Sequence, residues 1–123
     1  MAKNVDESLQ DAMSISGAIG AALVDYTSGM TLGTAGGGPI DLDVAAAGNT
    51  EVVRAKMAVM KALDIEGGIE DILITLKDQL HLIRMMDTDR GDGLFLYVAL
   101  SKDKANLAMA RHQLKNVEKE LAV

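Results

Sequence analysis

The sequence predicts a single α/β domain, spanning residues 1–123, with a five-stranded, largely antiparallel sheet. Three observations lead to this fold class. The length of 123 residues suits one domain. Short apolar runs bounded by turn residues indicate strands, and apolar residues at helical spacing recur at the start, middle and end of the chain. The expected order of elements is αββαβββα.

The first half of the chain opens with a helix. Asn4 followed three residues later by Glu7 is a capping-box pattern, so this helix begins after Asn4 and ends between about Ser14 and Ser16. Residues 18–25 are small and apolar, and a turn separates them from residues 30–34, which predicts a β-hairpin. The glycine-rich stretch 36–39 is expected to be a loop.

The second half contains a long helix and three strands. Residues 42–63 have helical spacing, and the glycines at 67 and 68 end the element. Residues 69–76, 79–86 and 94–100 are expected to be strands. The last of these is apolar throughout, which is typical of a central strand covered on both faces.

A final helix follows, for which Ser101 is the expected N-cap. Its apolar residues form one stripe: Leu107, Ala110, Leu114, Val117 and Leu121. We expect the long middle helix on one face of the sheet and the two terminal helices on the other, because the central strand needs cover on both sides.

Composition excludes several classes of partner and site. A net charge of −6 and the scarcity of aromatic residues argue against nucleic acid. The absence of cysteine excludes disulfides and thiolate metal sites, and the polar start of the chain is unlike a secretory signal, so a cytoplasmic location is expected. The longest apolar run is about half of what a bilayer span needs, so no membrane insertion is expected.

No catalytic, metal or cofactor-binding residues are predicted. The segment from Asp87 to Gly93 is superficially like a calcium loop but lacks the expected ligands at its fifth and twelfth positions, so it is interpreted as a turn. His81 and His112 are distant in sequence and have no spacing that suggests a metal site or a base beside a nucleophile. We therefore do not expect an enzyme.

The middle helix is apolar over an arc of about 220°, more than one sheet can cover. Its apolar residues divide into two stripes: Gly48, Val52, Ala55, Val59 and Leu63 on one side, and Ala46, Val53, Met57 and Met60 on the other, with Asn49 and Lys56 between them. One stripe can face the sheet and the other a partner, unless a terminal helix of the same chain covers it. An uncovered apolar stripe usually marks an interface.

The strand at residues 69–76 gives a second indication of self-association. Its run from Ile72 through Ile74 to Leu76 has no internal charge, proline or evident bulge that would discourage edge pairing. The strand could also be covered by its own chain. If it lies at an edge, two copies could join there, and the predicted homodimer interface comprises Ala46, Asn49, Val53, Lys56, Met57, Met60, Ile72 and Ile74.

Residues 17–25 running into the turn at Ser28 and Gly29, the long middle helix, and residues 94–100 before the last helix resemble the Roadblock family. This family comprises the profilin-like domains of dynein light chains and of bacterial regulators of small Ras-like GTPases. The resemblance extends from about Ser8 to Leu121. It implies a profilin-like α+β fold and a homodimer with antiparallel middle helices and edge strands joined into one sheet.

The resemblance also implies a small Ras-like GTPase, or a larger assembly, as a partner of the paired-helix face or of a surface beside it. That face would present Glu51, Arg54, Ala58 and Lys61. The resulting hypothesis is a non-catalytic, homodimeric regulator or scaffold of such a GTPase. The alternative is a small-molecule sensor of the PAS or GAF type, since helices on an antiparallel sheet also build ligand pockets.

Overall fold

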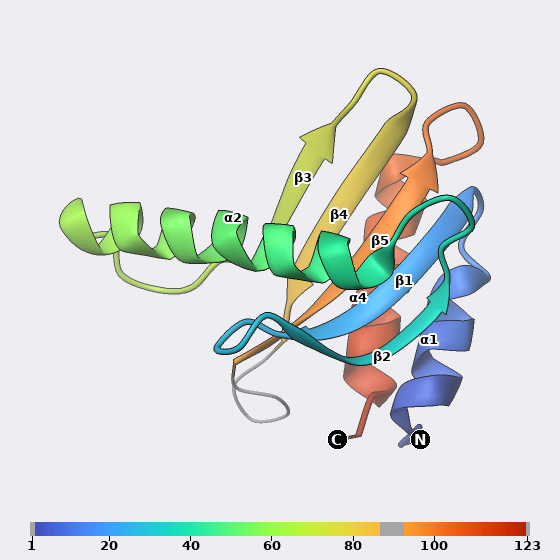
Figure 1. The fold of residues 1–123 in the computed structure, drawn as a ribbon, viewed down its shortest axis with the longest axis horizontal. Helices are drawn as coiled ribbons and strands as arrows, with labels where there is room; N and C mark the ends of the chain where they lie inside the picture. The colour runs from blue at the N-terminus through green and yellow to red at the C-terminus, as the bar shows by residue number, and fades with distance from the viewer. Residues whose placement is uncertain (1, 87–92, 123) are drawn as a thin grey trace.

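The computed structural model of the chain describes residues 2–86 and 93–122. Its sheet has five strands in the order β2-β1-β5-β4-β3, and every neighbouring pair is antiparallel. Helix α2 lies on one face of the sheet, and α1 and α4 lie together on the other (Figure 1). The predicted fold class, element order and layer arrangement are confirmed.

The first half of the chain forms α1 (Val5–Met13), β1 (Ala18–Asp25), β2 (Met30–Gly36) and α2 (Leu42–Ala62). Asn4 caps α1 with a complete capping box, as predicted. Strand β2 is two residues longer than expected because Ala35 and Gly36 still pair with β1. Asp41 caps α2 by accepting hydrogen bonds from the backbone N–H groups of Asp43 and Val44.

The second half forms β3 (Asp71–Thr75), β4 (Gln79–Met85), β5 (Leu94–Ser101) and α4 (Leu107–Glu120). The expected cap at Ser101 is wrong, because Ser101 is the last residue of β5. Asn106 caps α4 instead, and its side chain accepts a hydrogen bond from the N–H of Met109. The turn expected at Asp87 to Gly93 lies outside the described residues except for Gly93.

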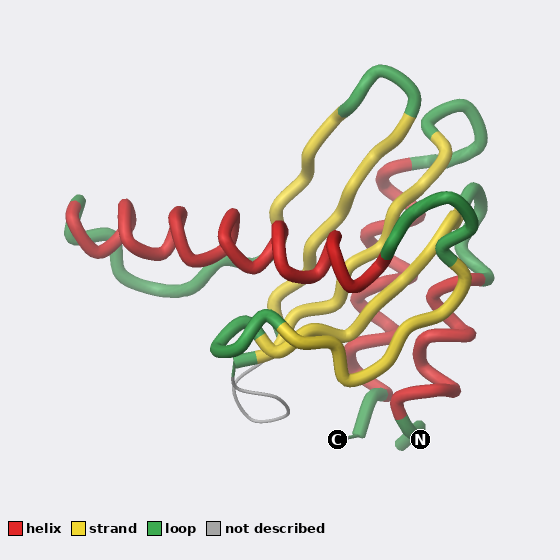
Figure 2. Tube along the Cα trace, viewed as in Figure 1, coloured by secondary structure: helices red, strands yellow, loops and turns green. Residues whose placement is uncertain are grey.

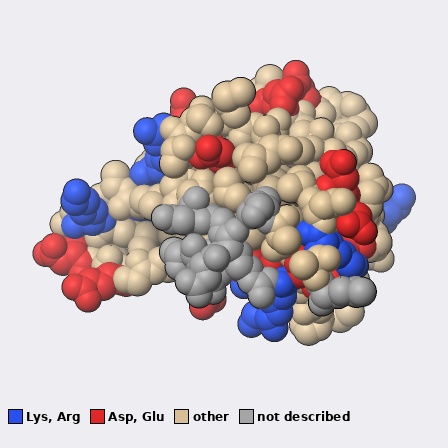
Figure 3. Space-filling model, turned by 90° about the horizontal axis from the view of Figure 1, so that it is seen from below, with Lys and Arg blue, Asp and Glu red and all other residues tan. Residues whose placement is uncertain are grey.

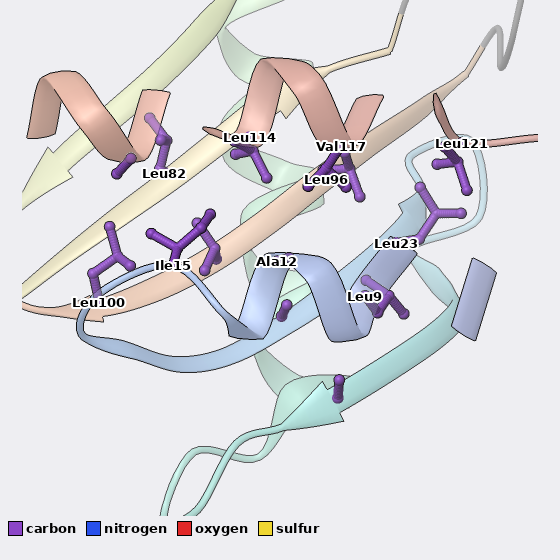
Figure 4. Close-up of a cluster of buried hydrophobic side chains, with 14 of the residues drawn as sticks. Leu9, Ala12, Ile15, Leu23, Leu82, Leu96, Leu100, Leu114, Val117 and Leu121 are labelled. Atoms are coloured by element: carbon purple, nitrogen blue, oxygen red, sulfur yellow. The ribbon is translucent and has the colours of Figure 1, made fainter. Parts of the chain in front are cut away.

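The larger of the two apolar clusters lies between the sheet and the terminal helices. Figure 4 shows Leu9 and Ala12 of α1 and Leu114 and Val117 of α4 pointing toward the strands, which contribute among others Leu23, Leu82 and Leu96. The predicted stripe of the last helix is confirmed, with Ala110, Leu114, Val117 and Leu121 buried. Strand β5 is buried on both faces from Leu94 to Leu100, as expected of a central strand.

The second cluster lies between the sheet and α2. It joins Ala46 and Val53 of the helix to Phe95 and Tyr97 of β5 and to Ile83 of β4. The first part of α2 packs on β1 and β2. This cluster fixes the direction in which α2 crosses the sheet, and that direction determines which surfaces remain open.

Candidate interaction surface

Helix α2 is longer than the sheet beneath it. Figures 1 and 2 show that about half of the helix extends past the β3 side of the sheet. Its buried residues, Leu42, Ala46, Thr50 and Val53, all lie in the first part, and from Arg54 to Ala62 every residue is exposed except the half-buried Met60. In a single chain the second half of α2 therefore has almost no contact with the sheet.

The structure reverses the assignment of two residues in the predicted dimer interface. Ala46 and Val53 have no exposed surface, because they pack against Phe95 and Tyr97 of their own sheet. They cannot become further buried by a second copy, so placing them in an interface was wrong. The stripe that includes them is the one that faces the sheet.

The other stripe is the free one. Val52 and Val59 are 38% and 48% exposed, and Leu63, directly after the helix, is 62% exposed. A Cβ added to Gly48, on the same side, would meet no atom within 4 Å. Glycine in a helix interior costs about 1 kcal/mol relative to alanine, and nothing in the single chain explains that cost at Gly48.

The remaining interface candidates on α2 lie in three different environments. Asn49 is half-buried and hydrogen-bonds to the hydroxyl of Tyr97. Lys56 is exposed. Met57 and Met60 line a groove of about 460 Å³ between the second half of α2, the connection to β3 and the end of β4.

Strand β3 is an edge of the sheet, as the dimer hypothesis requires. Ile72 and Ile74 are half-buried, Ile72 packs against the cluster under α2, and Ile74 lies on the same face of the strand. The register of β3 with β4 is regular. The opposite edge differs, since Leu32 is an extra residue in β2 between the paired residues Thr31 and Gly33. Such a bulge disfavours further strand pairing, so β3 is the edge better suited to it.

The outward-facing backbone groups of β3 follow from its hydrogen bonds with β4. Leu76 N–H donates to the carbonyl of Gln79, and Met85 N–H donates to that of Glu70. Because hydrogen-bonded positions alternate in an antiparallel pair, the backbones of Ile72 and Ile74 also face β4. The backbone groups of Asp71, Leu73 and Thr75 consequently face the free edge.

A polar cluster lies on the α2 face of the sheet. The Tyr97 hydroxyl is 3.2 Å from His81 Nδ1, and His81 Nε2 is 2.7 Å from Gln79 Oε1. Burial lowers the pKa of His81 below its usual 6.5. Burial also raises the pKa of Tyr97, an effect that the hydrogen bond with Asn49 opposes. These contacts satisfy the half-buried polar atoms and indicate a structural role for His81.

The predicted partner surface is accessible. Glu51, Arg54, Ala58 and Lys61 are all exposed on α2. Figure 3 shows basic and acidic side chains near one another at the end of the molecule that carries the second half of this helix, so the surface has mixed charge.

Within residues 2–86 and 93–122, no three His, Cys, Asp or Glu side chains are grouped closely enough to hold a metal ion. None of the described helices is both long and apolar enough to cross a bilayer. The hydrogen-bond partners of His81 are the Gln79 side chain and the hydroxyl of Tyr97, a residue that is only 1% exposed. What the described residues offer is an apolar helix face, an open strand edge and a groove.

No protein-family model and no curated protein matches the sequence. Solved structures do match. A Roadblock/LC7 domain from Streptomyces avermitilis superposes with a TM-score of 0.81 over 95% of this chain and 93% of that chain, at 15% identity. The chain has the Roadblock fold. MglB from Myxococcus xanthus has a TM-score of 0.74 over 93% and 85% of the two chains, at 20% identity.

The gliding protein MglB from Thermus thermophilus matches with a TM-score of 0.70 and 20% identity over 94% of this chain and 88% of that chain. At such identities these likenesses describe the fold alone. The Roadblock fold of this chain therefore agrees with the resemblance found in its sequence, and its surface must be interpreted from its own residues.

The sequence interpretation missed one wall of the groove. Ile65 and Ile69 of the connection and Met85 and Met86 at the end of β4 were not predicted to share a surface with Met57. The excess of methionine, eight residues in the chain, was the available signal, since this side chain is common on adaptable apolar surfaces.

Proposed function

We propose that the chain is a non-catalytic, homodimeric interaction module that regulates or scaffolds a small Ras-like GTPase in the cytoplasm. The main support for the dimer is the second half of α2, which extends beyond its own sheet. Val59 in this half and Leu63 directly after the helix are exposed. A second copy supplies the missing cover. The exposed positions of the stripe are on the side of α2 that faces neither the sheet nor the groove.

The β3 edge supports a specific geometry for the pair. Centring a twofold axis on Leu73 pairs all five residues of β3 and uses the backbone groups that face outward. Ile72 then lies opposite Ile74 of the second copy on the α2 face, and the two second halves of α2 cover these side chains. Asp71 lies opposite Thr75, which keeps the two Asp71 carboxylates apart.

The GTPase role rests on the family resemblance and on the fold shared with MglB structures. A further MglB structure, described as having a tetrameric arrangement, has a TM-score of 0.69 at 18% identity, which supports assembly through this fold. The partner surface of this chain is Glu51, Arg54, Ala58 and Lys61, beside the paired helices.

The dimer is tested by disulfide trapping. Because the chain contains no cysteine, any disulfide must form through the introduced residue. In the proposed register the two Leu73 Cα atoms are about 5.5 Å apart, within disulfide range. Leu73→Cys should therefore form a covalent dimer under mild oxidation. Thr75→Cys is the matched control, since the two Thr75 residues lie on opposite sides of the axis; trapping through Thr75 but not Leu73 would exclude the register.

The GTPase role is tested with purified protein and the Ras-like GTPases of the same organism, each loaded with GDP or a GTP analogue. We expect one of them to bind in a nucleotide-dependent manner, and Arg54→Glu with Lys61→Glu to weaken binding at least tenfold. Lys77→Glu with Lys102→Glu is the charge-matched control, since both lysines are exposed, one in the β3–β4 turn and the other directly after β5. Absence of binding by every such GTPase would remove the GTPase from the proposal and leave the dimer untouched.

One observation favours the alternative, a small-molecule sensor. The groove of about 460 Å³ is within the size range of ligand sites. It lies at the surface under α2, whereas both faces of the sheet are packed with side chains. Thermal-shift screening with small metabolites distinguishes the two functions, because a sensor should be stabilised by one compound class and an interaction module should not.

A further inference from the structure

A chain of hydrogen bonds connects α2 to the sheet through four side chains. Asn49 of α2 hydrogen-bonds to the Tyr97 hydroxyl of β5. That hydroxyl lies 3.2 Å from His81 Nδ1, and His81 Nε2 lies 2.7 Å from Gln79 Oε1. A carboxamide oxygen can only accept, so Nε2 carries the ring proton and Nδ1 accepts from the tyrosine. The chain of hydrogen bonds therefore requires a neutral His81.

Protonation of His81 breaks this chain at Nδ1. A charged imidazole donates from both nitrogens, so it can no longer accept a hydrogen bond from the Tyr97 hydroxyl. The two rings are held edge to face with their centroids 5.5 Å apart, and Tyr97 is only 1% exposed. The hydroxyl consequently has little access to water as a substitute acceptor, and a buried donor that loses its acceptor costs free energy.

The proposed pairing places α2 of the second copy over His81. In one chain the second half of α2 crosses the sheet near Met85, at the start of β3 (Figure 1). A twofold axis at Leu73 exchanges the two ends of β3. The helix of the second copy then crosses at the end where Ile74 pairs with His81. His81 is half-buried in the single chain, so this helix removes more of its contact with water.

The neighbours of His81 in its own chain do not compensate a positive charge. Ile74 of β3 and Ala99 of β5 lie opposite it on the adjacent strands. Tyr97 is ionisable but neutral near pH 7. The turn at residues 77–78 has one lysine and one aspartate, both exposed. Among these described neighbours there is no net negative charge.

The covering helix adds positive charge. Met57 and Met60 form the sheet-facing side of the second half of α2, and Lys56 and Lys61 flank them at about 70° to either side. Both lysines are exposed in the single chain. Acidic side chains come only after the end of the helix, at Asp64 and Glu66. A protonated His81 would thus be covered by apolar and basic groups.

We propose that His81 makes the homodimer sensitive to pH: the chains pair while His81 is neutral, and its protonation in both copies separates them. This inference rests on the proposed function and adds a means of regulating the pair. Burial lowers the pKa of His81 below 6.5 in the single chain, and cover by the second copy lowers that pKa further. Separated chains therefore bind the proton more readily than the pair does, so acid favours separation.

Sedimentation equilibrium of the full chain at about pH 7.5 and about pH 5.5 tests the proposal. The dissociation constant should rise about tenfold or more at the lower pH, because each pair takes up as many as two protons when it separates. His81→Gln should abolish this rise, since glutamine does not titrate. His112→Gln is the matched control: His112 is exposed on α4, on the other face of the sheet, and its loss should leave the response intact. Circular dichroism at both pH values confirms that each chain is folded.

Nuclear magnetic resonance of the His81 ring separates the effect of cover from that of the single chain. Val59→Asp supplies a separated chain, because it introduces a carboxylate into the stripe that faces the second copy. The ring should titrate at a higher pH in this variant than in the wild-type pair. Equal titration midpoints in the two proteins would overturn the proposal, because pairing would then not change the proton affinity of His81.

The remaining outcomes distinguish this inference from the homodimer itself. A wild-type dissociation constant that stays within about threefold between the two pH values overturns the pH response and leaves the homodimer in place. A response that persists in His81→Gln, or that is lost in His112→Gln, also overturns the proposal, because another group then causes it. A wild-type chain that is monomeric at both pH values overturns the homodimer and this inference together.

Discussion

The substitution Val59→Asp tests self-association independently of the stability of the folded chain. Val59 is 48% exposed in the single chain, so about half of its burial energy is still available to an interface. Full burial of a valine side chain contributes about 2 kcal/mol, which leaves about 1 kcal/mol per copy and about 2 kcal/mol for the two symmetric copies. The loss of this contribution alone raises the dissociation constant about 30-fold, and burying two carboxylates raises it further.

The folded chain itself should tolerate the change. The position is in the exposed half of α2, and valine and aspartate have similar helix propensities, so the free energy of unfolding should change by about 0.5 kcal/mol or less. Sedimentation equilibrium measures the dissociation constant and circular dichroism measures the fold. Ala58→Asp adds the same charge on the neighbouring face and should leave the dimer intact.

Two results would refute this reasoning. One is a wild-type chain that sediments as a monomer at micromolar concentration. The other is a folded Val59→Asp variant whose dissociation constant lies within about threefold of the wild-type value, because that result removes the free stripe from the interface.

Three further changes test the fold. Asn106→Ala should lower the free energy of unfolding in urea by about 1 kcal/mol because it removes the cap of α4, whereas Ser101→Ala should leave it nearly unchanged. Arg84→Met should lower it by about 3 kcal/mol, since it removes the 2.7 Å ion pair with Glu118, a carboxylate that is only 9% exposed; a loss below 1 kcal/mol would contradict this. The pKa of His81 is lower in the folded chain, so the unfolded chain binds the proton more readily and the free energy of unfolding should fall as pH decreases through about 6.5. His81→Gln should abolish this part of the pH dependence, which is measured from denaturation midpoints.

Periodicity and turn chemistry were sufficient to predict most of the fold. Strand β1 begins and ends where predicted, and the Asn4 capping box forms. The cap of α4 was missed because Ser101 and Asn106 are both good N-cap residues, and the choice depends on how far β5 continues. Ser101 still pairs with Gln79, which keeps it in the sheet.

The candidate site was harder to predict for a related reason. The two stripes of α2 are similarly apolar, so the pattern indicates that one is free without indicating which. Tertiary packing determines which stripe faces the sheet, because Ala46 and Val53 are packed against the large side chains of Phe95 and Tyr97. The groove could not be predicted at all, because it joins residues of α2, the connection and β4 that only the crossing direction of α2 brings together.

The unequal edges of the sheet limit how far strand pairing can continue. If both edges were regular, copies could add head to tail, and the assembly would grow as a filament. Leu32 interrupts the regular register of β2, while β3 has no such interruption. Joining two copies through β3 gives a ten-stranded sheet with a bulged strand at each end, so growth by this route stops at the pair.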